Sequence, residues 1–197
     1  PVVLAMASLG VAIALRGLVQ IIWSGETQHY PREFREVIRL PMDVRVPPDG
    51  IFIAIVTIIL VVGVYLVLTR TKMGKAMRAT ADNPELALVS GINTQRVVWW
   101  TWGMGAVLAA TAGVLLAVFQ AQLLPIMGWK FLIPLFAAVI LGGIGNPYGA
   151  LVGAFVIGVT SEVSTQWINP SYKPAVAFAI MIAVLLVRPR GIFGGSE

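Results

Sequence analysis

Residues 51–69 read IFIAIVTIILVVGVYLVLT and contain no charged side chain. About 20 mostly apolar residues are enough for an α-helix to cross a hydrocarbon core roughly 30 Å thick. The stretch therefore predicts a transmembrane helix. The whole chain agrees, because 58% of its 197 residues are hydrophobic and 12% are charged, against roughly 25% charged in a typical soluble domain. This composition excludes a disordered chain, a nucleic-acid-binding domain and an ordinary cytosolic enzyme.

Further apolar stretches lie on both sides of residues 51–69. Residues 1–23 contain a single charge, Arg16, and residues 97–119 begin with a tryptophan cluster typical of a membrane interface. Residues 131–163 are apolar but are broken by GGIGNPYG, and residues 175–187 form the last span. The predicted fold class is an all-α polytopic membrane protein with about five to six transmembrane segments, including a glycine-broken helical hairpin.

Charge patterning predicts the orientation. The net charge is +5, and basic residues concentrate on the cytoplasmic side of membrane proteins. Residues 70–96 hold five basic and two acidic side chains, whereas residues 24–49 hold four basic and five acidic ones. We therefore expect residues 70–96 and the C-terminus in the cytoplasm and residues 24–49 outside. Within the outer loop, REFREVIRL at 32–40 predicts one or two short amphipathic helical turns.

The same topology constrains the glycine-broken region. Because residues 97–119 end outside and the last span must begin outside, residues 131–163 have to return to the outer face, either as a re-entrant hairpin or as two crossings. Non-helical backbone at membrane depth survives only where it is packed in protein or lines a wet cavity. The break is therefore a candidate wall of a translocation pathway, a small-residue packing interface, or both. Its residues are Gly142, Gly143, Gly145, Asn146 and Gly149.

Residues 70–96 have more local order than an ordinary connection. A helix is predicted over 73–81, and Asn83 followed by Pro84 predicts the N-cap and first position of a second helix. Glu85 then lies in the first turn, where the helix dipole favours an acid, and Gly91 suits the C-terminal end. Such a segment is either a basic surface attracted to anionic lipid or a docking element for a cytoplasmic partner.

Motifs for catalysis, metal binding or phosphate binding are missing from the sequence. It contains no G-x-x-x-x-G-K-[ST] phosphate loop, no H-E-x-x-H, no cysteine and a single histidine, His29. We therefore predict no enzyme activity, no cofactor and no metal site. Charges inside spans are costly and suspicious. Arg16 either snorkels to the outer interface or lines a vestibule, and Glu162 either pairs with Lys173 or serves the pathway.

The segment GKAMRATADNPELALVSGINTQRV at 74–97 resembles the cytoplasmic coupling loop of branched-chain amino acid ABC transporter permeases. The resemblance continues through AATAGVL at 109–115, AVILGGIG at 138–145 and LLVRP at 185–189, followed by Gly191 and Ile192. It covers nearly the whole chain except residues 24–49. Family members are longer, and the chain begins with Pro inside an apolar run. We therefore expect a C-terminal two-thirds fragment of one permease domain, whose N-terminal helices are missing.

The resemblance implies a function. Such permeases lie in the bacterial inner membrane, form half of a pore with a second related permease, and couple to two ATPase subunits inside and a substrate-binding protein outside. The implied substrate is a branched-chain or related amino acid, with urea or a short amide as the alternative within the family. An ATP-independent channel or a secondary transporter is the alternative from another class. The implied ATPase-coupling residues are Gly74, Arg78, Ala79, Asp82, Asn83, Ala87, Gly91 and Ile92.

Overall fold

A computed structural model describes residues 2–29, 38–40, 44–143, 145–188 and 191–194. The chain divides into two compact units. Unit 1 combines Pro1–Gly17 with Pro125–Glu197, and unit 2 is Leu18–Leu124.

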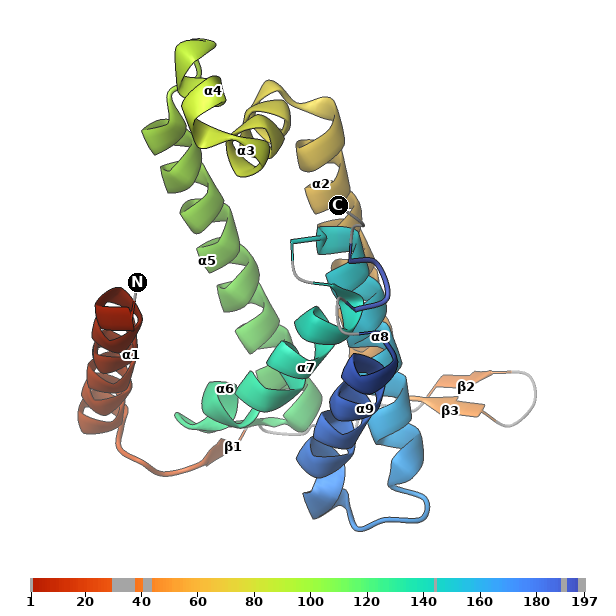
Figure 1. Ribbon diagram of the computed structural model, residues 1–197. Helices are drawn as coiled ribbons and strands as arrows, with labels where there is room; N and C mark the ends of the chain where they lie inside the picture. Colours follow the sequence, from red (N-terminus) through yellow and green to blue (C-terminus); the bar gives the residue numbers. More distant parts are fainter. Residues whose placement is uncertain (1, 30–37, 41–43, 144, 189–190, 195–197) are drawn as a thin grey trace. The chain divides into compact units, whose positions relative to one another are not determined.

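Helices dominate both units (Figure 1). In chain order they are α1 (Val2–Trp23), α2 (Pro48–Arg70), α3 (Lys72–Asp82), α4 (Pro84–Val89), α5 (Thr94–Gln120), α6 (Met127–Lys130), α7 (Leu132–Gly142), α8 (Pro147–Ser164), the 3-10 helix η1 (Pro170–Tyr172) and α9 (Lys173–Val187). Among the described residues, five helical stretches are long and apolar enough to cross a membrane: α1, α2, α5, α8, and η1 with α9. The 11 residues of α7 span only about 16 Å. The predicted all-α polytopic membrane fold is confirmed.

Strand structure is limited to short pairs in the described part of the chain. β1 (Gln28–His29) pairs antiparallel with β4 (Gln122–Leu123), and β2 (Ile38–Leu40) pairs antiparallel with β3 (Val44–Val46). The expected amphipathic turns over residues 32–40 are therefore wrong for residues 38–40, while residues 32–37 lie outside the described residues. Alternating β-branched residues in β3 favour strand pairing, and this pairing prevails over local helix propensity.

Asn-Pro dipeptides begin three of the helical elements. The Asn83 side chain accepts hydrogen bonds from the backbone of α4, Asn146 does so for α8, and Asn169 for η1. In each case the following proline occupies one of the first helical positions, where its missing N–H costs nothing. The chain thus carries its own start signals at the joints between apolar segments.

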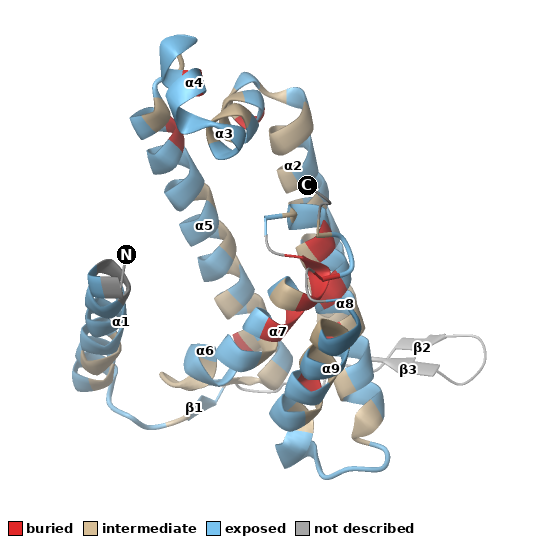
Figure 2. Cartoon of the chain, viewed as in Figure 1, coloured by how far each residue is buried: buried red, intermediate tan, exposed pale blue. Residues whose placement is uncertain are grey.

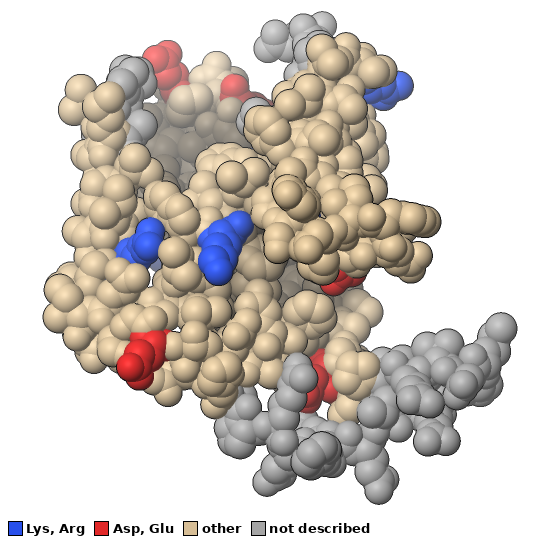
Figure 3. Space-filling view, turned by 90° about the horizontal axis from the view of Figure 1, so that it is seen from below, with Lys and Arg blue, Asp and Glu red and all other residues tan. Residues whose placement is uncertain are grey.

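The core of unit 1 consists of small and aliphatic residues where α7, α8 and α9 pack. Its members are Ala137, Ala138, Leu141, Ile157 and Ala177. Figure 2 shows these buried positions gathered on the three helices. Charged side chains are few and scattered on the face drawn in Figure 3, and no polar or charged side chain is buried among the described residues.

Unit 2 contains less buried surface. The long helix α2 has no buried residue, and α5 buries Val97 and Ala117. Large apolar side chains along both helices are exposed, as expected of spans whose solvent is lipid. The two spans are joined by α3 and α4, whose ends are tightly organised.

Candidate functional site

The joint between α2 and α3 is a close-packed elbow. Thr71 lies between the helices in extended conformation, and its hydroxyl oxygen accepts a hydrogen bond from the Gly74 N–H at 3.0 Å while donating to the Val67 carbonyl of α2. Gly74 is buried, and a Cβ placed there would collide with the carbonyls of Val67 and Leu68. Only glycine lets the first turn of α3 lie this close to the end of α2.

A single side chain organises the joint between α3 and α4. The Asn83 N–H donates to the Ala79 carbonyl at 3.1 Å and so ends α3. The Asn83 Oδ1 accepts from the N–H groups of Glu85 and Leu86 at 3.1 and 3.0 Å and so begins α4. The predicted N-cap and the predicted proline at the first helical position are confirmed. The angle between the two short helices therefore depends on one asparagine.

The end of α4 has the hydrogen bonds of a Schellman motif. Gly91 has a φ of +83°, a backbone conformation that glycine adopts without steric cost. Its N–H donates to the Leu88 carbonyl, and the Ile92 N–H donates to the Ala87 carbonyl, both at 3.0 Å. This arrangement confirms the predicted C-terminal role of Gly91.

Asn93 then accepts from the Arg96 N–H at 3.0 Å and caps α5. The segment over residues 70–96 is thus hydrogen-bonded at the start and end of both short helices, and we call it the α3–α4 segment.

The predicted coupling residues divide by exposure. Gly74 and Ala87 are buried and hold the short helices in place, and Ala79 and Ile92 are half-buried. The side chains left at the surface are Arg78, Asp82 and Asn83, with Gly91 also exposed.

Sequence reasoning missed two features of the α3–α4 segment. The first is an apolar surface on α4, where Leu86, Leu88 and Val89 are 64%, 57% and 87% exposed. The second is the cap at Thr71, although a threonine three residues before Gly74 and directly before a helical stretch is the usual signal of an N-cap. The apolar residues of α4 had no such signal, because their exposure depends on how α4 packs.

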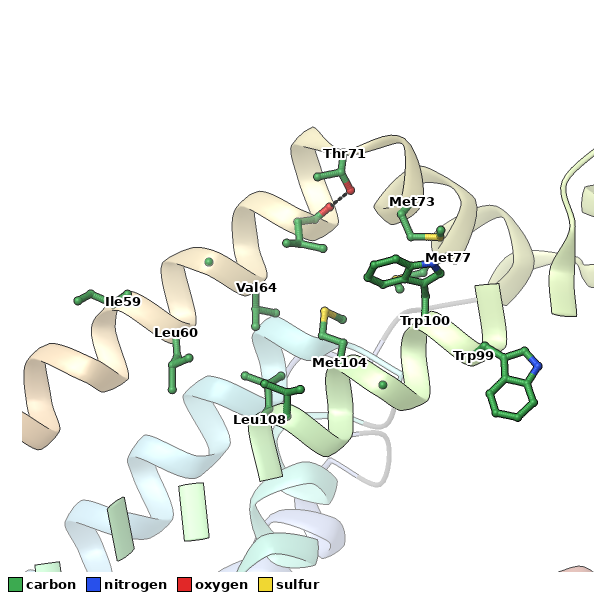
Figure 4. A pocket seen from close by; sticks show the side chains of 14 residues that line it. Ile59, Leu60, Val64, Thr71, Met73, Met77, Trp99, Trp100, Met104 and Leu108 are labelled. Atoms are coloured by element: carbon green, nitrogen blue, oxygen red, sulfur yellow. Dashed lines mark hydrogen bonds between the residues drawn. The ribbon is translucent and has the colours of Figure 1, made fainter. Parts of the chain in front are cut away.

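An apolar groove of about 970 Å³ lies between α2, α3 and α5. Figure 4 shows Val64 of α2, Met73 and Met77 of α3, and Trp100 and Met104 of α5 around it. The neighbouring Trp99 ring points away from this cluster in the same view. The methionines of α3 thus connect the α3–α4 segment to the spans on either side.

In unit 1, the predicted glycine-rich break is a junction between α7 and α8, which we call the glycine junction (Gly142, Gly143, Gly145, Asn146 and Gly149). Gly143 and Gly145 have φ values of +107° and +93°. The Asn146 Oδ1 caps α8 by accepting from the N–H groups of Tyr148 and Gly149 at 3.0 and 3.2 Å.

The two helices approach at backbone contact next to the junction. A Cβ on Gly142 would collide with the Gly149 carbonyl, and a Cβ on Gly153 would collide with the Ala138 carbonyl. Gly142, Gly143 and Gly149 are buried, whereas Gly145 is exposed and Asn146 half-buried. The junction is therefore mostly packed, with one side open.

A C-terminal tail of residues 191–194 completes the junction. The Ile192 N–H donates to the Leu141 carbonyl at 2.8 Å, and the Phe193 N–H donates to the Gly142 carbonyl at 3.1 Å. The Phe193 carbonyl accepts from the Asn146 side chain at 3.4 Å. The last carbonyls of α7 would otherwise be left without partners, and the tail supplies them.

Two charged residues within apolar stretches have partners inside unit 1. The Arg16 guanidinium lies over the Trp129 ring, 5.4 Å from its centroid, in a cation–π arrangement. Lys173 forms an ion pair with Glu162, which confirms the pairing that the sequence suggested. His29 lies in β1 of unit 2 and is exposed. No group of three potential metal ligands occurs among the described residues.

The family model for the permease component of branched-chain amino acid transport systems matches residues 2–185. The chain is 40% identical over 143 residues to the high-affinity branched-chain amino acid transport system permease protein LivH of Salmonella typhimurium, covering 73% of this chain and 46% of the relative. BraD of Pseudomonas aeruginosa, also named as such a permease, is 37% identical over 147 residues (75% and 48%). The ribose import permease protein RbsC of Bacillus subtilis is 30% identical over 150 residues (72% and 47%).

No solved structure matches the chain. Its matched residues span about half the length of these curated relatives. The family model, however, covers nearly all of the chain and agrees with the predicted resemblance. The chain belongs to the permease component family of branched-chain amino acid transport systems.

Proposed function

We propose that the protein is a permease subunit of a bacterial inner-membrane ABC importer for branched-chain or related amino acids. It forms half of the translocation pore with a second related permease, and an external binding protein delivers the substrate. The α3–α4 segment faces the cytoplasm and docks the ATPases, and residues 24–49 face outward. The observation that carries this proposal is the α3–α4 segment, two short helices capped at every joint and fixed to two spans.

The geometry of the α3–α4 segment suits mechanical coupling. Movement of a docked ATPase reaches the pore only through an element that does not bend. The close approach of Gly74 to α2 and the cap at Asn83 stiffen the segment. The exposed Leu86 and Val89 offer apolar contacts, and Arg78 offers a charge that can pair with an acidic partner. Such apolar centres with charged margins are typical of docking surfaces.

The energy source belongs to the partner subunits in this proposal. The chain has no phosphate-binding loop, and the glycine junction lacks the lysine such a loop requires. Binding of ATP by separate subunits therefore accounts for both the missing motif and the docking segment.

The glycine junction contributes a wall of the passage in the same proposal. Its buried glycines bring α7 and α8 together, and the open side at Gly145 and Asn146 is available to face the pore. These 197 residues contain no cysteine, so each single-cysteine variant introduces one thiol into this part of the chain. In the transporter, Leu151→Cys on the exposed side of α8 should react with a water-soluble thiol reagent. The rate of this thiol reaction should change while the transporter is transporting leucine. If the thiol groups of both Leu151→Cys and Tyr148→Cys do not react, the glycine junction serves only to pack α7 against α8 and does not line the passage.

Uptake into proteoliposomes tests the function. The transporter is reconstituted with its ATPases and binding protein, and uptake of labelled leucine, isoleucine, valine and urea is compared. We expect ATP-dependent uptake of branched-chain amino acids. Uptake of urea alone would assign the alternative substrate within the family. Uptake that persists without the ATPases would instead indicate a channel or a secondary transporter.

Two variants test docking. Arg78→Glu reverses the exposed charge of α3, and Gly91→Trp places a bulky side chain where φ is positive. Both should reduce co-purification of the ATPases at least several-fold while membrane insertion is retained. Lys130→Glu, an exposed basic residue of α6 outside the segment, is the matched control. Unchanged co-purification with both test variants would contradict the proposal.

A further inference from the structure

The groove between α2, α3 and α5 has no partner within the described part of unit 2 and is lined almost entirely by hydrocarbon and thioether groups. The lining residue Thr71 has its hydroxyl engaged with Val67 and Gly74. Apart from the indole N–H groups of Trp99 and Trp100, water in such a cavity would find few side-chain hydrogen-bond partners, so an apolar occupant fits it best. At about 970 Å³, the groove is at the upper end of ligand pockets, which measure roughly 300–1,000 Å³.

The position of the groove along two spans indicates where such an occupant comes from. Ile59 and Val64 of α2 and Leu108 of α5 line it within the apolar stretches, so it is accessible to the acyl chains of surrounding lipid. Met73, Met77 and Met104 line the end next to α3 (Figure 4). Unbranched thioether side chains adapt to flexible apolar partners, which suits a disordered acyl chain better than a rigid ligand.

Positive charge gathers at the same end of the groove. Arg70, Lys72 and Lys75 flank the lining residues Thr71 and Met73 in sequence, and all three are exposed. None of the three forms an ion pair within the described residues. No acidic residue occurs from residue 70 until Asp82 at the far end of α3. Basic residues beside a span attract anionic headgroups.

We propose that the groove holds an acyl chain of an anionic phospholipid whose headgroup lies against the basic residues at the α2–α3 elbow. The headgroup contacts Arg70, Lys72 and Lys75, and the chain extends along α2 and α5 past Met104. Bound in this way, the lipid fills the space under α3 and supports its packing on the spans. The inference depends on the membrane-spanning character of α2 and α5 and not on the transported substrate.

The groove glycines provide a matched pair of variants. Gly103 lines the groove and Gly105 does not, although both lie on α5 with open space beyond their Cα atoms. Gly103→Leu should place a side chain in the groove and obstruct an acyl chain there, whereas Gly105→Leu adds the same side chain elsewhere on the helix. Leucine is the better helix former, so both variants are expected to fold. Lys72→Gln with Lys75→Gln tests the headgroup contact, with Lys130→Gln as the control.

The experiment measures lipid retention by native mass spectrometry. The transporter, purified with the subunits that accompany it, is titrated with dioleoyl phosphatidylglycerol or dioleoyl phosphatidylcholine in micelles. We expect saturable retention of phosphatidylglycerol, lost in Gly103→Leu and kept in Gly105→Leu. Each lysine replaced should weaken phosphatidylglycerol binding about fivefold and leave the weak phosphatidylcholine binding unchanged.

Three results would overturn the proposal. Equal retention of the two lipids would show that binding does not depend on an anionic headgroup. Retention unaffected by Gly103→Leu would show that the lipid does not bind in the groove. Absence of retained lipid in the unmodified transporter would also overturn it, because the groove would then be covered by protein. Cross-linking of a Gly103→Cys variant to another helix would identify that covering.

Discussion

The α7–α8–α9 bundle of unit 1 and the α2–α5 region of unit 2 are both built from apolar helices, but they are held together differently. In the bundle, glycine and alanine bring backbones into direct contact and form a buried core. Between α2 and α5, few residues are buried, and order comes from hydrogen bonds at helix ends. Because lipid is as apolar as leucine, helices in a membrane gain little from burying large side chains and more from close packing. The bundle is therefore expected to lose stability when a larger side chain is placed between its helices. The α2–α5 region is expected to lose stability when a helix cap is removed.

The largest effect is expected from Gly153→Leu in the bundle. A Cβ at this position already collides with the Ala138 carbonyl, so α7 and α8 must separate. The expected destabilisation is about 3 kcal/mol, the upper end of overpacking costs. Thermal unfolding in micelles, followed by size-exclusion chromatography, measures it.

The control is Gly158→Leu on the same helix, where nothing lies within 4 Å of the added Cβ. It should unfold at the temperature of the unmodified protein. A loss of stability of equal size in both variants would mean that leucine is tolerated poorly throughout α8 and that close packing at Gly153 is not the cause.

The second effect tests the elbow between α2 and α3. Its close backbone packing is the feature of unit 2 that most resembles the packing within the bundle. Gly74→Ala places a methyl group against the Val67 and Leu68 carbonyls and should cost about 2 kcal/mol. Because α3 can move away from α2 without opening a core, the loss should be local. Hydrogen exchange over residues 72–82 should accelerate while unfolding of unit 1 is unchanged.

Gly113→Ala on α5 is the matched control, since nothing lies within 4 Å of its Cβ, it does not line the groove, and alanine is the better helix former. If hydrogen exchange in α3 of the Gly74→Ala variant is as slow as in the unmodified protein, the elbow accommodates the added methyl group. The expected local loss of order in unit 2 would then be contradicted.

The third effect is the loss of a cap. Asn83→Ala removes the acceptor for two N–H groups at the start of α4 and should cost about 1 kcal/mol. Hydrogen exchange over residues 84–90 reports the change, and Asn83→Ser, which keeps an acceptor, should restore most of the protection. Equal exchange in the alanine and serine variants would indicate that Pro84 and Gly91 define α4 without the cap.

The parts of this comparison that the sequence predicts are those encoded within a few residues. Uninterrupted apolar length identifies α2 and α5, and Asn-Pro followed by Gly91 locates α4, because caps depend on neighbours along the chain. The break at the glycine junction was equally visible as a run of glycines.

The parts that could not be predicted depend on residues far apart in sequence. The bond from Asn146 to the Phe193 carbonyl joins residues 47 positions apart, and no local pattern indicates that a tail will cap α7. The groove likewise exists only once Met73 and Trp100 are brought together. The close approach at Gly153 is of the same kind, because a glycine in a span does not show which backbone it will meet.

The smallest effect is expected where neither kind of order operates, at the ion pair between Glu162 and Lys173. Both side chains are largely exposed, at 56% and 39%, and exposed pairs contribute between nothing and about 1 kcal/mol. Glu162→Gln should therefore change stability by only a few tenths of a kcal/mol, and added salt should reduce even that difference because it screens the pair. Lys173→Gln should change stability by the same amount, and the double variant should lose no more stability than either single one, since the interaction is already absent.

Leucine uptake should remain within twofold of the unmodified transporter in all three variants. Uptake abolished by Glu162→Gln but retained in Lys173→Gln would instead assign the carboxylate to the translocation pathway, because a structural pair depends equally on both partners whereas a pathway acid does not.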